Sequence, residues 1–564
     1  MKIFLILLLA LSFRLYGLNW DQGYYFHPDE RMIVMVTDKI KLPATITDFF
    51  HPSSPLNPQF FAYGSFPIYL LRFLSWLLAP ISPLLASYAQ MNLVGRVISA
   101  IFDTLSVLLI YKICLLTFKS KSTAYLASIL YALSVLPVQL SHFYAVDTTL
   151  NFFILLTLYW AINLYLKPNL KSAIFVGISF GLALATKISA TVLLLSISLA
   201  LIVEFLLSLK KEIIGFQTNI FSILFHRLQK IIHPRYWFHL LLLFLIIFLI
   251  TIIVFIINQP YALIDFSTFW RQIKEQNAMT KDAFVFPYTL QYVGTTPFLY
   301  QLKNIFLWGQ GPILGVISVL GFIFTLTNLI RGFFHRGNEK SEACQLILFS
   351  FFLAYFFIVG QFAIKFMRYC LPLYPLFSIF AANFLISLRR FLLPIFILGH
   401  LLWLIAFLAI YRQPNTRVTA SIWTQNHIPP GSLILREHWD DGLPVGYNRN
   451  YRFIDLPLYD PDDDPQKWQF INQSLQMGDY LIIASNRLYT PLQKLTDCSQ
   501  LPPHRCYPKT AKYYQDLFAG KLDYQLVANF ESYPSLFGYP INDQAADESF
   551  TVYDHPKILI FQRL

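Results

Sequence analysis

The feature that most constrains this chain is a set of long apolar runs. One of them, residues 240–257, is eighteen residues long, and Thr251 is its only polar side chain. A helix of roughly 20 apolar residues crosses the hydrocarbon core of a bilayer. Hydrophobic residues make up 56% of the 564-residue sequence and charged residues only 13%, whereas soluble domains are about one quarter charged. These values exclude a disordered chain and a single soluble domain, and they predict a polytopic α-helical membrane protein.

The apolar runs predict eleven transmembrane helices. Their ranges are 2–18, 92–117, 122–140, 147–166, 171–186, 189–208, 238–258, 304–330, 345–364, 369–388 and 391–411. The fifth and sixth are short and nearly continuous, so both one broken helix and a tight hairpin fit the sequence. The first run resembles a secretory signal, but Arg14 lies where a small-residue cleavage site would be. We therefore expect it to be an uncleaved anchor.

Basic residues are unequally shared between alternate loops. One set of loops holds 14 Lys and Arg against three acidic residues, whereas the set that contains 19–91 and 259–303 is nearly balanced. Because cytoplasmic loops are enriched in Lys and Arg, we expect a cytoplasmic N-terminus and extracytoplasmic long loops. The formal charge of +12 is then largely topological, and it does not indicate a nucleic-acid partner.

The composition changes after residue 411. Residues 412–564 contain 14 basic and 17 acidic residues, with many turn-forming Pro, Gly and Asp. We expect strands at 432–435, 480–484, 525–528, 550–553 and 558–561, and a helix near 509–519. The chain is thus divided into a transmembrane domain, 1–411, and an extracytoplasmic mixed α/β domain, 412–564. Cys498 and Cys506 could form a disulfide there, but loop geometry decides this and the sequence does not.

Two adjacent acids, Asp29 and Glu30, follow His27 and Pro28 just beyond the first span. Pro28 favours the first turn of a helix, and Asp29 would lie near its positive end. Successive residues point in different directions, so one carboxylate can face a site while the other holds a cation or a backbone amide. A general base needs one such positioned carboxylate. A solvated helix cap is an alternative explanation of the same dipeptide.

The outer loops contain two further segments of interest. Aromatic residues around Tyr63 are followed by an amphipathic helix that ends near Leu78, a pattern that suits the membrane interface. The short loop 141–147 contains His142, Tyr144 and Asp147, and its acid begins the next span. Asp147 could cap that helix, line a wet cavity, or do both.

Three cations lie on the side of the membrane where the charge rule predicts few. Lys187 lies between two short spans, and Lys365 and Arg368 precede Tyr369 at the outer end of another. Lys365 and Arg368 are three positions apart, so on a helix they would share a face. Snorkelling of single cations is common, but a cluster needs an anion, and a phosphate at the membrane surface would supply one.

Arg96 and Asp103 lie seven positions apart on one face of the second span. A charge buried in a membrane must find a partner. We therefore expect these two residues to pair with side chains of other helices.

The order of these segments resembles the membrane-embedded glycosyltransferases of the C-type fold. That family includes dolichyl-phosphate-mannose protein mannosyltransferases and the aminoarabinose transferase of lipid A. The resemblance covers residues 1–411, and segment 546–557 of the tail is similar to the ends of bacterial relatives. The lumenal repeats of the eukaryotic mannosyltransferases and the Glu-Lys-Pro-Pro signature of the aminoarabinose enzymes are absent. The resemblance therefore points to a bacterial plasma (inner) membrane enzyme whose donor sugar the sequence does not identify.

The resemblance implies transfer of a sugar from a polyprenyl-phosphate carrier to a hydroxyl of a protein, lipid or glycan, with inversion at the anomeric carbon. Asp29 would be the general base, with Glu30 beside it and Asp147 as a further acid of the cavity. The remaining roles are donor-phosphate binding by Arg368, Lys187, Lys365 and Tyr369, and lining of the cavity by His27, Tyr63, Arg96, His142 and Tyr144.

Alternatives stay open at this point. If Asp29, Glu30 and Asp147 converge, their oxygen ligands suit Mg²⁺ or Mn²⁺, although a pair of carboxylates does not require a metal. A transporter is the main rival function, but transporters place their polar groups near the middle of the bilayer. A non-catalytic assembly protein is the other, if the acids are only helix caps.

Overall fold

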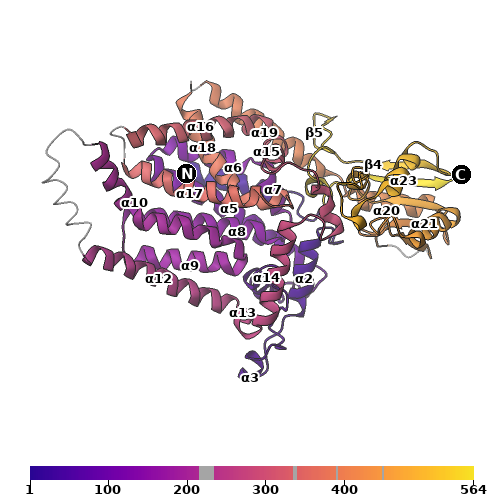
Figure 1. The fold of residues 1–564 in the computed structure, drawn as a ribbon, viewed down its shortest axis with the longest axis horizontal. Coiled ribbons are helices and arrows are strands. Elements are labelled where there is room, and N and C mark those ends of the chain that lie inside the picture. The colour runs from indigo at the N-terminus through magenta and orange to yellow at the C-terminus, as the bar shows by residue number, and fades with distance from the viewer. Residues whose placement is uncertain (215–233, 335–338, 389–390, 447–449) are drawn as a thin grey trace.

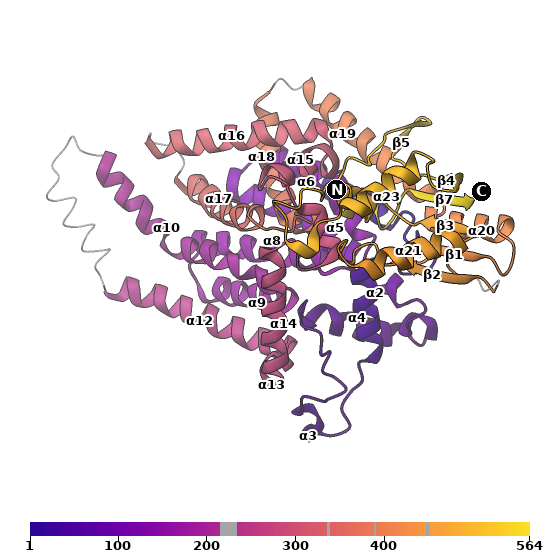
Figure 2. The ribbon, with the colours of Figure 1, turned by 45° about the vertical axis from the view of Figure 1, so that its right-hand side comes forward.

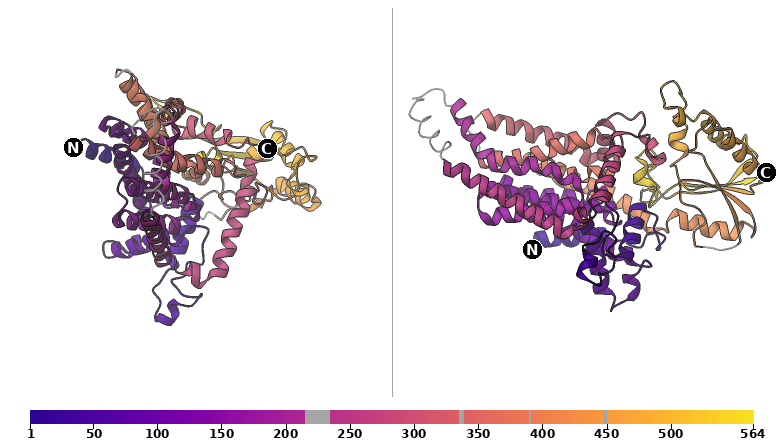
Figure 3. Two further views of the ribbon diagram at one scale, coloured as in Figure 1. Left: turned by 60° about the vertical axis from the view of Figure 1, so that its left-hand side comes forward. Right: turned by 60° about the horizontal axis from the view of Figure 1, so that its bottom comes forward.

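The computed structural model describes residues 1–214, 234–334, 339–388, 391–446 and 450–564 (Figure 1). A bundle of long helices forms one end of the molecule, and a smaller unit with a β-sheet forms the other (Figure 1). The N-terminus lies in the bundle and the C-terminus at the far end of the smaller unit (Figure 3). The predicted fold class, a helical membrane protein with a C-terminal α/β domain, is confirmed.

The helices of the bundle follow the apolar runs of the sequence. They are α1 (Lys2–Leu15), α5 (Met91–Phe118), α6 (Lys121–Ala132), α7 (Val135–Ser141), α8 (Val146–Leu166), α9 (Leu170–Thr186), α10 (Leu193–Ile214), α12 (Pro234–Asn258), α16 (Pro312–Phe334), α17 (Glu339–Gly360), α18 (Tyr374–Ser387) and α19 (Leu392–Leu408). In the described ranges, seven helices are long and apolar enough to span a membrane, or eight if the bent pair α6–α7 is one span. The predicted number of eleven is therefore not confirmed. Helices α1 and α9 have only 14 and 17 residues, and a full crossing takes roughly 20.

Two predicted spans begin differently in the structure. The span predicted at 304–330 begins at Pro312, because a short helix, α15 (Leu299–Asn304), and a π-turn, η4 (Ile305–Gly309), come first. The span predicted at 369–388 opens with a 3₁₀ helix, η5 (Met367–Leu373).

Helices α9 and α10 are separate and are joined by the 3₁₀ turn η2 (Ile188–Val192). Much of the basic loops on which the predicted orientation depends, including 215–233, 335–338 and 389–390, lies outside the described residues.

Short helices of the loops predicted to be extracytoplasmic lie at the end of the bundle near the smaller unit, and α3 projects away from both (Figure 2). They are α2 (Pro28–Lys39), α3 (Ile46–Phe49), α4 (Ser65–Leu78), η1 (Pro83–Ala86), α13 (Tyr261–Ile264), α14 (Phe266–Lys281) and η3 (Pro287–Tyr292). Helix α4 buries Ile68 and Leu71, whereas Phe73 and Leu77 are exposed. The predicted amphipathic helix is therefore confirmed.

The C-terminal domain, called the tail below, contains a five-stranded sheet in the order β2-β1-β3-β7-β4. Its strands are β1 (Leu433–Glu437), β2 (Arg452–Leu456), β3 (Tyr480–Ile483), β4 (Tyr524–Phe530) and β7 (Ile558–Arg563). Strand β1 pairs in parallel with β2 and β3, and β7 is antiparallel to β3 and β4. Helices α20 (Thr416–His427), α21 (Pro465–Met477), α22 (Tyr489–Leu492) and α23 (Pro508–Phe518) flank the sheet. Cys498 and Cys506 form a disulfide with a Cα–Cα distance of 5.4 Å.

One predicted strand of the tail is wrong. Residues 550–553 belong to the short helix α24 (Glu548–Thr551) and the turn after it. The Asp547 side chain accepts a hydrogen bond from the backbone N–H of Ser549 and so caps this helix. Phe550 and Val552 are buried in the hydrophobic core of the bundle instead of in the sheet. This segment therefore joins the tail to the transmembrane domain.

Candidate active site

The start of α2 is fixed by His27. Its Nδ1 accepts a hydrogen bond from the backbone N–H of Glu30 at 3.4 Å, and its ring packs on those of Phe143 and Tyr553. Burial, reinforced by the nearby charge of Arg368, lowers the pKa of His27 well below its usual value. The ring is therefore neutral, and Nδ1 remains available as an acceptor.

Glu30 points into the protein and is fully buried. Its carboxylate accepts hydrogen bonds from Nε and Nη2 of Arg96 at 2.9 and 2.5 Å and from the backbone N–H of Tyr144 at 2.9 Å. Arg96 also binds Asp21 at 2.7 Å. Gly95 allows Tyr144 to pack closely against α5, since a Cβ at position 95 would lie 2.4 Å from Cγ of Tyr144. Glu30 is therefore not a solvated cap, and Arg96 pairs with other segments, as predicted.

Asp29 points the other way and forms an ion pair with Arg368, which η5 carries. The two side chains are 18% and 11% exposed. Part of each side chain is therefore accessible to solvent, whereas the Glu30–Arg96 pair is sealed from it. The two neighbouring carboxylates therefore point in different directions and have different partners, as predicted for successive residues.

A second carboxylate–cation pair lies beside the first. Asp147, in the first turn of α8, is 3.5 Å from Nζ of Lys187, and the two side chains are 6% and 19% exposed. Nζ of Lys187 lies 4.6 Å from the ring centre of Tyr369, and the guanidinium carbon of Arg368 lies 5.6 Å from the same centre. Tyr369 therefore contacts the cations of both pairs. We call Asp29, Tyr63, Asp147, Lys187, Arg368 and Tyr369 the outer charge cluster.

Tyr63 joins the cluster through a close contact between two backbones. The N–H of Gly64 donates to the carbonyl of Thr186 at 2.9 Å, and a Cβ at Gly64 would lie 1.8 Å from the carbonyl oxygen of Ala185. Only glycine fits this contact. It holds the ring centre of Tyr63 5.8 Å from Nζ of Lys187. Burial raises the pKa of Tyr63 well above its usual value, so its hydroxyl stays protonated.

Lys365 does not share a helical face with Arg368, because it precedes η5 and its backbone is not helical. Its ammonium donates to the carbonyl of Ala363 at 3.1 Å, and the residue is only 4% exposed. Burial lowers the pKa of Lys365. Within the part of the chain that the structure describes, Lys365 forms no ion pair with a carboxylate.

Three other predicted residues belong to the scaffold around the cluster. The ring nitrogens of His142 contact the carbonyl oxygens of Val138 and Tyr16 at 2.8 and 2.7 Å. The hydroxyl of Tyr144 donates to the carbonyl of Pro67 at 2.7 Å. Arg96 is fully buried with its two acids. These side chains hold the outer loops together instead of lining the cluster.

The tail contributes residues that the sequence reasoning did not single out. The ring centre of Tyr553 lies 4.3 Å from that of His27. Burial raises the pKa of Tyr553 to about 12, although the charges of Arg368 and Arg487 oppose the shift. Arg487 itself pairs with Glu548 at 2.8 Å. The likeness of segment 546–557 to the ends of bacterial relatives was the only signal for Glu548 and Tyr553, and Arg487 lies outside that segment.

No group of three His, Cys, Asp or Glu within the described ranges gathers to hold a metal ion. Asp29, Glu30 and Asp147, which were the candidate ligands, each face a different basic side chain. These carboxylates therefore do not form a common ligand set.

Residues 73–225 match the family described as dolichyl-phosphate-mannose-protein mannosyltransferase. This match confirms the predicted resemblance to C-type glycosyltransferases. It covers less than one third of the chain and includes Arg96, Asp147 and Lys187, whereas Asp29 and Arg368 lie outside it.

Solved structures of two glycosyltransferases resemble the chain. Archaeal oligosaccharyltransferase AglB from Archaeoglobus fulgidus is 14% identical, with a TM-score of 0.46 and coverage of 100% of this chain and 88% of that chain. ArnT from Cupriavidus metallidurans, bound to undecaprenyl phosphate, is 12% identical, with a TM-score of 0.48 and coverage of 99% and 97%. Likenesses of this degree say nothing about substrates. No curated protein matches the sequence.

Proposed function

We propose that this protein is an inverting glycosyltransferase of the bacterial inner membrane. It moves a sugar from a polyprenyl-phosphate donor to a hydroxyl of a protein, lipid or glycan on the extracytoplasmic side. The observation that carries the proposal is the outer charge cluster, in which Tyr369 lies between the pairs Asp29–Arg368 and Asp147–Lys187.

The cations of the cluster bind the donor phosphate. Arg368 offers a planar fork of donors that matches two phosphate oxygens, and Lys187 adds a mobile ammonium beside it. Lys365 contributes a further buried positive charge near Arg368. As the bond between the sugar and the phosphate breaks, negative charge grows on the phosphate, and these fixed cations stabilise it.

Asp29 is the general base. A phosphate that binds Arg368 replaces Asp29 as the partner of the guanidinium, and the carboxylate of Asp29 is then free to accept the proton of the acceptor hydroxyl. The acceptor oxygen then forms a bond to the anomeric carbon, and the bond from that carbon to the phosphate oxygen breaks. The polyprenyl phosphate leaves with the electron pair, while the acceptor proton passes to Asp29.

Asp147 and Glu30 have different parts in this scheme. Asp147 keeps Lys187 in place, and its negative charge favours the positive charge that develops on the sugar ring. Glu30 does not touch the substrate. With Arg96, it holds α2 against α5, so that Asp29 stays at the mouth of the cluster.

The variant Asp29→Asn tests the base. We expect product formation to fall by about 10²–10⁴-fold, the usual contribution of a general base, without loss of folding. The measurement is mass spectrometry of products after reconstituted protein receives a panel of polyprenyl-phosphate sugars and acceptors. Asp38→Asn is a matched control on the same helix, since Asp38 is 40% exposed and forms only a 3.8 Å pair with Arg72. Full activity of Asp29→Asn would refute the assignment of Asp29 as the general base. Movement of the substrate across the membrane without a new glycosidic bond would favour a transporter.

The variants Arg368→Gln and Arg368→Lys test the phosphate site. Loss of the guanidinium in Arg368→Gln should raise the donor KM, because the phosphate is bound in the ground state, and lower kcat, because the phosphate gains negative charge in the transition state. Lysine restores the charge but not the fork, so Arg368→Lys should recover part of kcat/KM. Arg271→Gln is the control, since Arg271 forms an exposed pair with Glu275 on α14. An unchanged donor KM in Arg368→Gln would refute the assignment.

A further inference from the structure

A small β-hairpin projects from the tail beside the outer end of α19 (Figure 1). Its strands are β5 (Ser535–Leu536) and β6 (Tyr539–Pro540), with Leu536 paired to Tyr539. The two residues between them, Phe537 and Gly538, form the turn. The hairpin is not part of the five-stranded sheet of the tail.

The turn carries an aromatic residue where the backbone disfavours one. Phe537 and Gly538 have φ angles of +51° and +86°. A two-residue turn with both φ values positive favours Asn-Gly, because a bulky side chain is strained in this region. Phe537 is nevertheless 85% exposed, and Tyr539 is 79% exposed. Neither backbone preference nor packing within the chain accounts for an aromatic residue at this tip.

The base of the hairpin packs against the last turns of α19, a helix that is long and apolar enough to span a membrane. Leu536 and Ile541 line an apolar pocket together with Trp403 and Ala406 of α19. Trp403 lies five positions before Leu408, the end of α19, and thus roughly 8 Å along the helix from its outer end. The hairpin therefore packs beside the part of α19 that lies in the outer leaflet.

The surface around the hairpin continues the lipid-facing surface of the bundle. Leu398 on α19 and Ile313 on α16 are exposed apolar residues of membrane-spanning helices. The pocket that Ile313 lines together with the hairpin has a volume of about 250 Å³, and its lining is mainly apolar apart from Gln310 and His400. A pocket with a mainly apolar wall accepts hydrocarbon. Here the hydrocarbon next to it is lipid.

A similar apolar projection lies on the other side of the molecule. Helix α3 carries Ile46, which is 81% exposed, and Phe50 follows it with 64% exposure. In Figure 1, α3 and the hairpin lie on opposite sides of the outer end of the bundle. The first belongs to the transmembrane domain and the second to the tail. Both would meet the same face of the bilayer.

We propose that the hairpin is a membrane anchor of the tail. Phe537 and Tyr539 insert into the outer leaflet of phospholipid, and a phospholipid acyl chain occupies the pocket beside α19. Aromatic side chains, Tyr above all, favour this interfacial depth. The strain at Phe537 is offset by contact with lipid. The tail is then held at two points, by its covalent link to α19 and by the hairpin. This inference does not depend on the catalytic assignment.

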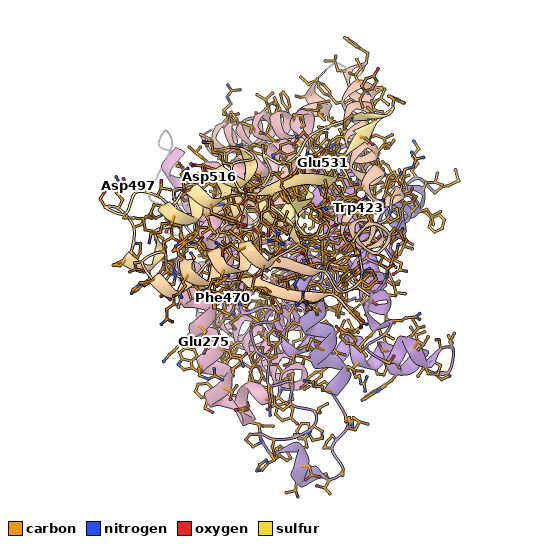
Figure 4. All side chains as sticks on the ribbon, turned by 90° about the vertical axis from the view of Figure 1, so that its right-hand side faces the viewer. Glu275, Trp423, Phe470, Asp497, Asp516 and Glu531 are labelled. Atoms are coloured by element: carbon orange, nitrogen blue, oxygen red, sulfur yellow. A yellow bond between two sulfur atoms is a disulfide. The ribbon has the colours of Figure 1, made fainter. Side chains whose placement is uncertain are left out.

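Spin labels on the full-length protein in phospholipid nanodiscs test the anchor. The labelled sites are Phe537→Cys and the control Phe470→Cys, an exposed aromatic position on α21 of the tail (Figure 4). We expect the label at 537 to collide several-fold more with oxygen, and less with a water-soluble nickel chelate, than the label at 470. Equal accessibility to the nickel chelate at both sites would overturn the proposal. Protection of the label at 537 from both reagents would also overturn it and would indicate a protein partner.

The variant Phe537→Asn separates insertion from folding of the hairpin. Asparagine suits the positive φ at this position, so the turn stays formed. A label at Tyr539→Cys in this variant should become more accessible to the nickel chelate than the same label in the parent chain. An unchanged depth would show that Phe537 does not hold the hairpin in the leaflet.

Discussion

At the scale of single residues, Asp29 and Glu30 show how two adjacent carboxylates acquire different tasks. Their alternate directions could be predicted from the sequence, since successive residues of a helix face different sides. Their partners could not, because Arg96 and Arg368 lie far along the chain and nothing local selects them. Glu30 is sealed with Arg96 and Asp21, whereas Asp29 meets solvent beside Arg368. The first arrangement serves stability and the second serves the proposed reaction.

The variant Glu30→Gln should therefore lower stability more than Asp29→Asn does. Breaking a buried ion pair costs about 3–5 kcal/mol, and we expect the lower end here because Arg96 keeps Asp21. The midpoint of thermal unfolding in detergent, followed by circular dichroism, measures the effect. Asp29→Asn is the matched neighbour, since its side chain is already partly solvated. Equal midpoints for the two variants would contradict the division of work between them.

At the scale of elements, the sequence predicted best where one physical requirement dominates. Long apolar runs became helices, and the strands at 432–435, 480–484, 525–528 and 558–561 formed, because burial decides both patterns. The predicted strand at 550–553 failed because its apolar residues are buried in the bundle, and Asp547 caps a helix there. The late start of the span at Pro312 follows a π-turn, which apolar composition does not reveal.

The contact between the segment after Tyr63 and the end of α9 gives an element-scale prediction. A Cβ at Gly64 would lie 1.8 Å from the carbonyl oxygen of Ala185, so Gly64→Ala must separate two backbones. Such overpacking costs about 1–3 kcal/mol, and it should move Tyr63 away from Lys187. We expect lower transferase activity with little loss of helix content. Gly399→Ala is the control, because its Cβ would meet only the flexible end of Ile313. Retained activity in Gly64→Ala would show that this contact does not position the cluster.

At the scale of the whole molecule, the sequence predicted two domains but not how they meet. The charge of the loops predicts the side of the membrane for each loop, and it predicts that the tail lies on the side of Asp29. It contains no information on which part of the tail lies over the cluster. The structure shows that the end of the tail does so: Tyr553 packs on His27, and Gln139 of α7 donates to the carbonyl of Phe550 at 2.7 Å. The end of the tail therefore packs against the residue that caps α2, two positions before Asp29.

The two ion pairs of His555 predict that the stability of the junction depends on pH. Its ring binds Asp543 at 2.8 Å and Asp554 at 2.5 Å, and Asp554 also accepts from Tyr411 at 2.8 Å. Burial alone would lower the pKa of His555, but the two carboxylates raise it to about 10. The folded state thus holds this proton more tightly than the unfolded chain, in which His has a pKa of about 6.5. The stabilisation is therefore complete below pH 6.5, declines as the pH rises, and is lost above about pH 10.

This reasoning predicts that the thermal midpoint of the wild-type protein falls more steeply between pH 7 and pH 10 than that of His555→Gln. The variant lacks the ionisable group, so its midpoint is lower at pH 7 and the two curves converge as the pH approaches 10. Hydrogen exchange of segment 547–555 should rise with pH in the wild type, beyond the intrinsic increase seen in a peptide of the same sequence. His504→Gln serves as control, since His504 is an exposed residue of the same domain, 75% accessible, and should leave the wild-type curve unchanged. Parallel curves for the wild type and His555→Gln would mean that the histidine does not hold its proton at the junction, and that its ion pairs do not contribute to the stability of the protein.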